Sequence, residues 1–222
     1  MATLLSRQYQ VIRGVLVLVA GFALVAGVRA AAVPPDVLVK EVADDVLKIV
    51  QQDRELRAGD QSKMAALLEE KIVPHFDFER MTRLAVGRSW RQATPEQRRQ
   101  LVDEFRTLLV RSYSSAYSAY RDVVVEVKPL KLRPSDDDVL VRTQIKLPGG
   151  APPVSVDYSM FKASSDWKVY DVTVEGVSLV TTYRNTFGEM VRQGGIEGLV
   201  KALSDMNAEK AAPPPPSGAA KK

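Results

Sequence analysis

The sequence contains no cysteine and a single histidine among its 222 residues. Without cysteine the fold has no disulfide and no thiol nucleophile, and a mature N-terminus cannot carry a lipid on Cys. The one histidine, His75, stands between Pro74 and Phe76, without the cluster of further ligands that a zinc site needs. We therefore predict no metal and no cofactor.

Motifs for catalysis are missing as well. No serine lies in a G-x-S-x-G elbow, and no glycine-rich phosphate loop follows a strand. Asp77 and Glu79 near His75 suggest acid–base chemistry, but they fit more simply as the N-cap and first-turn acid of a helix. The acidic run 136–138 falls in a hairpin turn and lacks the other ligands of a calcium site. We predict no catalytic residue.

An excess of charge of one sign is absent from the body of the chain. The whole sequence has 31 basic and 27 acidic residues. Three of the arginines belong to the N-terminal leader and three of the lysines to the C-terminal tail, so the remainder is close to neutral. A nucleic-acid-binding protein concentrates positive charge in its folded part, so this class is excluded.

The N-terminal leader has the pattern of a secretory signal peptide. Arg7 and Arg13 precede an uncharged apolar run from Val15 to Val28, and small residues then allow cleavage after Ala30 or Ala32. The run is too short for a comfortable membrane span. We therefore expect export of a soluble protein, most simply to the periplasm of a Gram-negative bacterium.

The leader and a proline-rich C-terminus bound one domain. Residues 1–32 are predicted to be the cleaved signal peptide, and residues 33–208 are predicted to form a single α+β domain. Residues 209–222 are rich in proline and poor in core residues, so we expect them to be disordered.

Hydrophobic periodicity separates the domain into helices and strands. Asp36 is expected to cap the first helix, and Thr94 with Gln97 forms a capping box for the longest one. Helical spacing of apolar residues predicts helices over 36–52, 60–73, 77–87, 94–122, 177–191 and 196–207. Alternation with short turn segments between predicts four antiparallel strands over 123–132, 138–147, 153–162 and 167–176.

The alternation places apolar side chains on one sheet face. Val141 and Ile145 share a face in the second strand, and Tyr170, Val172 and Val174 share one in the fourth. Helical stripes of apolar side chains are expected to face this sheet: Val102, Phe105, Leu109, Tyr113, Ala116, Tyr117, Tyr120, Leu179, Tyr183, Phe187, Met190 and Val191. Several members are tyrosines, which suit the mouth of a cavity better than a dry core.

A group of arginines surrounds Trp90. Arg88, Arg91, Arg98 and Arg99 lie within nine residues of it in the sequence. Two interpretations are open, a basic rim that meets a lipid phosphate or an acidic partner, and a solvated helix face.

Two long stretches resemble one family of proteins. FDFERMTRLAVGRSWRQATPEQRRQLVDEF (76–105) resembles the signature of the MlaC family, also called the toluene-tolerance family, and WKVYDVTVEGVSLVTTYRNTF (167–187) matches a second typical stretch. The resemblance extends from about Pro35 to Asn207. The proline-rich tail lies outside it.

The resemblance implies a fold and a set of partners. The fold would be α+β, with a four-stranded antiparallel curved sheet like that of NTF2-type domains and helices packed on one face to enclose an apolar cavity. The function would be that of a monomeric periplasmic carrier of phospholipid, within a system that maintains outer-membrane lipid asymmetry. The implied partners are an inner-membrane ABC transporter with an MCE-domain ring and an outer-membrane lipoprotein–porin complex.

Under this hypothesis the apolar sheet face and its facing helices line the cavity. The predicted lipid-binding residues are Leu84, Phe105, Leu109, Tyr113, Val141, Ile145, Val156, Tyr158, Tyr170, Val172, Leu179, Tyr183 and Phe187. One alternative is an NTF2-like isomerase or dehydratase for a small apolar substrate, which needs an inward carboxylate or histidine. A second alternative is an interaction adaptor with a solid core.

Overall fold

The computed structural model describes residues 32–119, 123–164 and 166–209, and it leaves out the side chains of 115–119. The predicted signal peptide and tail lie outside the described residues, apart from Ala32 and Glu209. The side chains of Ala116, Tyr117 and Tyr120, expected on the long apolar stripe, also lie outside them. The helices are α2 (Pro35–Gln52), α3 (Arg54–Ala58), α4 (Gln61–Lys71), α5 (Phe78–Val86), α6 (Pro95–Ala119) and α7 (Leu179–Ala208), with 3-10 turns η1 (Val73–His75), η2 (Gly87–Gln92) and η3 (Pro148–Gly150).

The strands form one antiparallel sheet in chain order. They are β1 (Val124–Val127), β2 (Asp138–Lys146), β3 (Val154–Lys162), β4 (Trp167–Val174) and β5 (Val177–Ser178). The α+β prediction is confirmed, but over the described residues the sheet has five strands and not four. The added strand β5 pairs with the end of β4 through the turn at Glu175 and Gly176, directly before α7. A two-residue strand is too short to give a periodic signal.

Local capping chemistry explains several of the helix starts. Thr94 and Gln97 form the predicted capping box, with reciprocal backbone-to-side-chain hydrogen bonds of 3.0 and 3.2 Å. Asp77 accepts from the backbone N–H of Arg80 at 2.8 Å and so caps α5, as predicted. Asp36 was expected to cap α2, and this is wrong: α2 starts at Pro35, and the Asp36 carboxylate accepts from Leu130 N–H at 3.2 Å.

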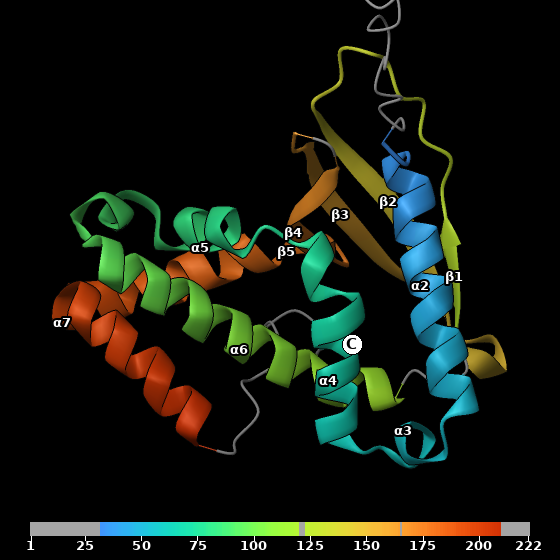
Figure 1. Cartoon of the computed structure of the whole chain (residues 1–222), viewed down its shortest axis with the longest axis horizontal. Helices are drawn as coiled ribbons and strands as arrows, with labels where there is room; N and C mark the ends of the chain where they lie inside the picture. The colour runs from blue at the N-terminus through green and yellow to red at the C-terminus, as the bar shows by residue number, and fades with distance from the viewer. Residues whose placement is uncertain (1–31, 120–122, 165, 210–222) are drawn as a thin grey trace, which may run out of the picture. The chain divides into compact units, whose positions relative to one another are not determined.

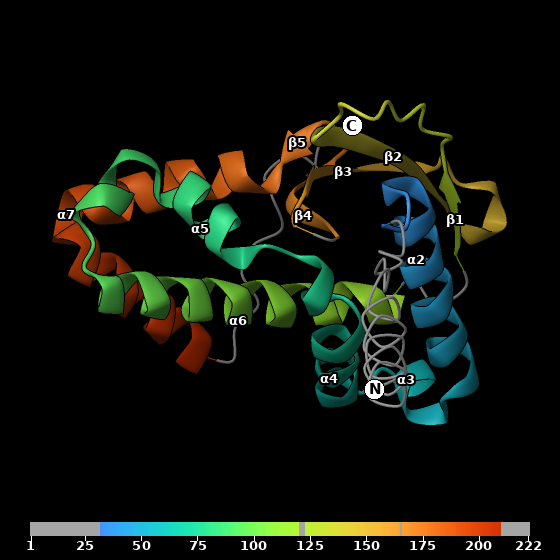
Figure 2. The ribbon, with the colours of Figure 1, turned by 45° about the horizontal axis from the view of Figure 1, so that its top comes forward.

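The helices pack in two groups. One helix, α2, packs against β1 and β2, and beyond it α3 and α4 lead to α6. The other group consists of α5, α6 and α7, which pack on one another and reach the sheet through β4. Figure 2 shows this second group beside the sheet, with α2 at the opposite end. The long helix α6 belongs to both groups, because it also contacts α4.

Candidate functional site

The clearest feature of the sheet is an apolar face. We call it the inner face and define it as the side chains that point to the side of the sheet on which α2 packs. Cross-strand partners place Val141 beside Tyr158, and Tyr158 beside Val172. Leu38 and Val39 of α2 pack against the cluster that includes Val141. The inner face consists of Val139, Val141, Thr143, Ile145, Val154, Val156, Tyr158, Met160, Trp167, Val169, Val172 and Val174.

The inner face carries one polar aliphatic side chain, and that side chain is satisfied. The Thr143 hydroxyl donates to the carbonyl oxygen of Val156 at 2.6 Å. This bond removes the hydroxyl from the surface that the sheet offers to its surroundings. What remains is aliphatic side chains, the Met160 thioether and the Tyr158 and Trp167 rings, which form a surface for an apolar guest.

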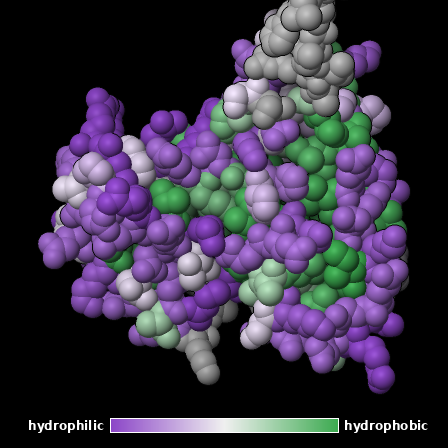
Figure 3. Space-filling view, in the orientation of Figure 1, coloured by the Kyte–Doolittle hydropathy of each residue, from purple (hydrophilic) through white to green (hydrophobic). Residues whose placement is uncertain are grey.

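Burial is uneven across the inner face. Val141 and Met160 are fully enclosed, whereas Tyr158, Val172 and Ile145 are only partly buried. Helix α2 therefore leaves part of an apolar surface accessible. Figure 3 shows hydrophobic surface gathered over α2 and between α2 and α4 on the same side of the molecule. Apolar area that the fold leaves uncovered is characteristic of a binding surface.

The predicted lipid-binding residues divide between two clusters. The sheet members Val141, Tyr158 and Val172 belong to the inner-face cluster. Val156 and Ile145 also lie on the inner face, and Leu179 is buried at the start of α7. The helical members gather in the α5–α6–α7 cluster instead: Leu84, Phe105, Leu109, Tyr113, Tyr183 and Phe187.

The helical cluster is centred on aromatic contacts. The Phe105 ring packs edge-on against Tyr183 and Phe187, at centroid distances of 4.8 and 5.1 Å. Phe105 and Phe187 have 0% and 1% of their surface exposed. Burial raises the pKa of the Tyr113 and Tyr183 hydroxyls. These side chains form the packed core of α5–α6–α7.

Tyr170 does not share a face with Val172, which corrects the predicted alternation of β4. The register shifts between Ser159 and Met160, so β4 has one extra residue there. The shift turns Tyr170 to the other face, where its hydroxyl donates to Asp138 at 2.8 Å. Burial and the Asp138 carboxylate raise the pKa of Tyr170.

The same bulge brings residues into the inner face that periodicity had missed. Trp167 and Val169 are buried in the inner-face cluster, because their alternation is offset by one residue from that of Val172. Phe76 packs against both clusters, and a bridge joins it to Val169 at the edge of β4. An unbroken strand pattern carries no signal for such an offset. The pairing with β3 decides it.

Groups suited to acid–base chemistry lie away from the inner face. Asp157 and Asp171 occupy the opposite sheet face. Asp171 accepts from the Ser178 hydroxyl at 2.5 Å and from Val180 N–H at 3.0 Å, and so holds the start of α7. Asp157 keeps one buried oxygen without a hydrogen-bond partner in the part of the chain described.

His75 is partly buried in η1. Burial, and secondarily Lys168, lowers the pKa of its imidazole. Over the described ranges, no three His, Asp or Glu side chains gather in a way that would hold a metal ion. Nor does any helix there have the length and apolar character needed to cross a membrane.

Comparisons with known proteins agree on one family. The family model described as MlaC protein matches residues 40–205. The intermembrane phospholipid transport system binding protein MlaC of Haemophilus influenzae is 24% identical over 163 residues, which cover 72% of this chain and 76% of that protein. The toluene tolerance protein ttg2D of Pseudomonas putida is 25% identical over 185 residues, 82% of this chain and 83% of that one.

A solved structure shares the fold. The phospholipid-binding protein of Ralstonia solanacearum, solved in complex with a phospholipid, superposes with a TM-score of 0.74. It is 40% identical in sequence, and the match covers 80% of this chain and 99% of that chain. The sheet, the helices around it and the two sequence stretches therefore have one explanation: the chain belongs to the MlaC family.

Proposed function

We propose that this protein binds phospholipid and carries it through the periplasm, with acyl chains against the inner face and the headgroup outside. The observation that carries the proposal is an apolar inner face that α2 leaves partly accessible. Support comes from the 40% identical Ralstonia protein, whose structure contains a phospholipid. The proposed contacts are the partly buried Ile145, Tyr158 and Val172; the buried Val141, Val156 and Leu179 and the α5–α6–α7 cluster support them from behind.

The energetics of lipid transfer fit such a surface. A two-tailed lipid has on the order of 30 methylenes, each worth about 0.8 kcal/mol against water, so bare transfer costs about 24 kcal/mol. A barrier of that size makes spontaneous escape a matter of hours to days, to order of magnitude. A carrier only has to offer a comparable apolar lining at both membranes. This job requires no catalytic residue.

The proposed setting follows from the leader and the family. A secretory signal peptide over residues 1–32 would deliver the protein to the periplasm. There it would act as a monomer between an outer-membrane lipoprotein–porin complex and an inner-membrane ABC transporter with an MCE-domain ring, maintaining outer-membrane lipid asymmetry. The Haemophilus relative, named as an intermembrane phospholipid transport system binding protein, supports this assignment.

Co-purified lipid tests the proposal. Protein purified from the periplasm without delipidation should retain phospholipid, seen as added mass in native mass spectrometry and as a phosphate-staining spot in thin-layer chromatography. Repeated lipid-free preparations that also fail to take up phospholipid from vesicles would contradict it.

A further inference from the structure

A concave site lies apart from the inner face. A pocket of about 420 Å³ opens where α5, η2 and α7 meet. Its lining consists of Arg83, Leu84, Gly87, Arg88, Arg91 and Arg184. Four of these side chains are guanidinium groups and none is acidic. We call this the arginine pocket.

The local fold explains why the arginines converge. Gly87 has a φ of +64°, which favours glycine, and its N–H donates to the Arg83 carbonyl as α5 ends. The turn at Gly87 brings Arg88 and Arg91 of η2 to the same pocket as Arg83. From α7, Arg184 donates through Nε to the carbonyl of Leu84 at 2.9 Å. The C-terminal end of a helix favours a cation there.

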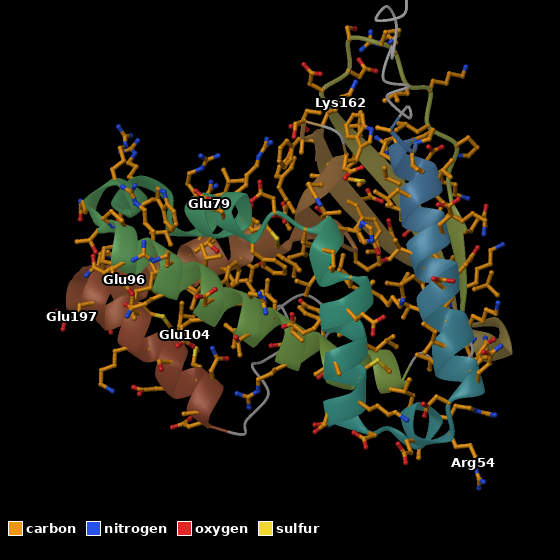
Figure 4. All side chains as sticks on the ribbon, viewed as in Figure 1. Arg54, Glu79, Glu96, Glu104, Lys162 and Glu197 are labelled. Atoms are coloured by element: carbon orange, nitrogen blue, oxygen red, sulfur yellow. The ribbon has the colours of Figure 1, made fainter. Side chains whose placement is uncertain are left out.

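Two arginines of the same segment have partners among the described residues. Arg98 stacks on Trp90 at 5.5 Å and donates to its carbonyl, and Arg99 pairs with Glu96. In the part of the chain that the structure describes, Arg83, Arg88, Arg91 and Arg184 form no ion pair. The sequence has no acidic residue between Glu79 and Glu96, the two acids labelled near this segment in Figure 4.

This arrangement has an electrostatic consequence. Guanidinium groups stay protonated at every physiological pH, so the charges around the pocket repel one another. A bound anion relieves the repulsion. Planar forks of N–H donors match the oxygens of a phosphate and can bind them in pairs. The pocket is concave and of small-molecule size, which suits one compact anionic group better than an extended surface.

We propose that the arginine pocket binds a phosphate group. Two sources share this chemistry: the headgroup phosphate of a lipid at a membrane surface, and free phosphate in solution. The site is separate from the inner face, so the proposal holds whether or not the inner face carries acyl chains.

The test compares two double variants of the full-length protein. Arg88→Gln/Arg91→Gln removes two pocket charges. Lys48→Gln/Arg54→Gln is the matched control, because both residues are exposed and lie in α2 and α3, as the labelled Arg54 shows in Figure 4. Inorganic phosphate is titrated by NMR at low salt, and flotation measures binding to phosphatidylglycerol vesicles. Lipid co-purification and thermal unfolding are measured in parallel.

The expected result is a loss of about tenfold or more in phosphate affinity for the pocket variant, since it removes charge-assisted hydrogen bonds, and little change for the control. If the pocket variant loses both vesicle binding and phosphate binding, the source of the phosphate is a lipid headgroup. Phosphate binding without vesicle binding identifies free phosphate. If the double variant does not fold, Arg91→Gln alone replaces it.

Three results would overturn the proposal. The first is a wild-type protein that binds neither phosphate nor vesicles. The second is an equal loss in the pocket variant and the control, which would mean that net charge alone acts. The third is binding of polyglutamate through the pocket that phosphate does not displace, which would identify an acidic protein surface as the ligand. The amount of co-purified lipid tests the carrier function independently. If that amount is unchanged in the pocket variant, any of these three results contradicts the arginine pocket alone and not the proposed lipid carriage.

Discussion

Arg80 joins α5 to the sheet through three contacts. Its guanidinium lies 4.4 Å from the Phe161 ring centroid and 3.9 Å from that of Tyr170, and it pairs with Asp138 at 3.1 Å. Tyr170 donates to the same carboxylate. The bulge in β4 makes this cluster possible, because it turns Tyr170 toward Arg80 and away from the inner face.

Removing the Arg80 guanidinium should destabilise the fold. Arg80→Gln is expected to lower the free energy of unfolding by about 1–2 kcal/mol, from lost cation–π stacking and a partly exposed ion pair. Urea denaturation measures it. Arg83→Gln on the same helix is the matched control, since Arg83 is exposed and has no ion pair in the described ranges, and its cost should stay within about 0.5 kcal/mol. Equal costs would show that the stacking adds nothing.

Glu126 links β1 to β2 and should affect acid stability. Hydrogen bonds from Lys128 and then Lys146 lower the pKa of Glu126 to about 2 from an ordinary 4.5. A folded-state pKa below the unfolded one contributes stability above pH 4.5, and that contribution disappears as pH falls toward 2.

Glu126→Gln should therefore flatten the fall in stability between about pH 5 and pH 2. Urea midpoints of the wild type and of Glu126→Gln across this range measure the difference. Glu41→Gln, at an exposed position of α2, is the control. The ion pairs are surface-exposed, so 0.5 M NaCl (roughly a 4 Å screening length) should shrink it. A wild-type and variant pH profile of the same steepness would contradict the assignment.

The sequence predicts the role of a residue well when that role depends only on residues close to it in the chain. Asp77, Thr94 and Gln97 act within one helical turn, and their capping roles were predicted correctly. Tyr170 was placed on the wrong face, because its direction depends on pairing with β3 and not on its own neighbours. Adjacent residues determine a helix cap, whereas the register between two strands depends on residues far apart in the sequence.

Among the elements, α7 has a break at Gly195, between the two helices predicted over 177–191 and 196–207. Gly195 has φ +66° and ψ −165°, a conformation that only glycine adopts readily, while Gly194 keeps a negative φ. The break lets Ile196, Leu199 and Leu203 turn back onto the helical cluster.

The two glycines therefore predict opposite effects of alanine. Gly195→Ala should destabilise the protein by about 1–3 kcal/mol, since alanine cannot adopt this backbone without strain. Gly194→Ala should be neutral or stabilising by up to about 1 kcal/mol, because a Cβ there meets nothing within 4 Å. Thermal and urea unfolding of both variants measure the contrast. Equal effects of the two substitutions would mean that the folded protein does not require the positive φ of Gly195.

Periodicity predicted that each helix buries an apolar stripe but not what covers it. The stripe of α6 was expected to face the sheet, yet Phe105 packs on Tyr183 and Phe187 of α7. A 3.6-residue period indicates a buried face, and many partners satisfy it equally. Which partner covers the stripe depends on where the long connections of the chain place α7. That placement is a property of the whole topology. This explains why the predicted lining divides between two clusters.

For the molecule as a whole, the question is whether the inner face borders space or packed side chains. Val172 and Thr173 are neighbours on β4 with opposite directions, so they offer a matched pair. Both are partly buried. Replacing each by tryptophan places the same indole once on the inner face and once on the opposite one.

Val172→Trp should displace lipid while the protein stays folded. If acyl chains occupy the space beside Val172, the indole fills that space and native mass spectrometry should show less bound phospholipid, with a thermal midpoint near that of the delipidated wild type. Thr173→Trp should keep its lipid. A solid core would respond differently: the added ring would overpack it, costing about 1–3 kcal/mol, and lipid content would not distinguish the two variants. That second pattern would favour the interaction adaptor over the carrier, because an apolar face without room for an alkyl chain has nothing to transport.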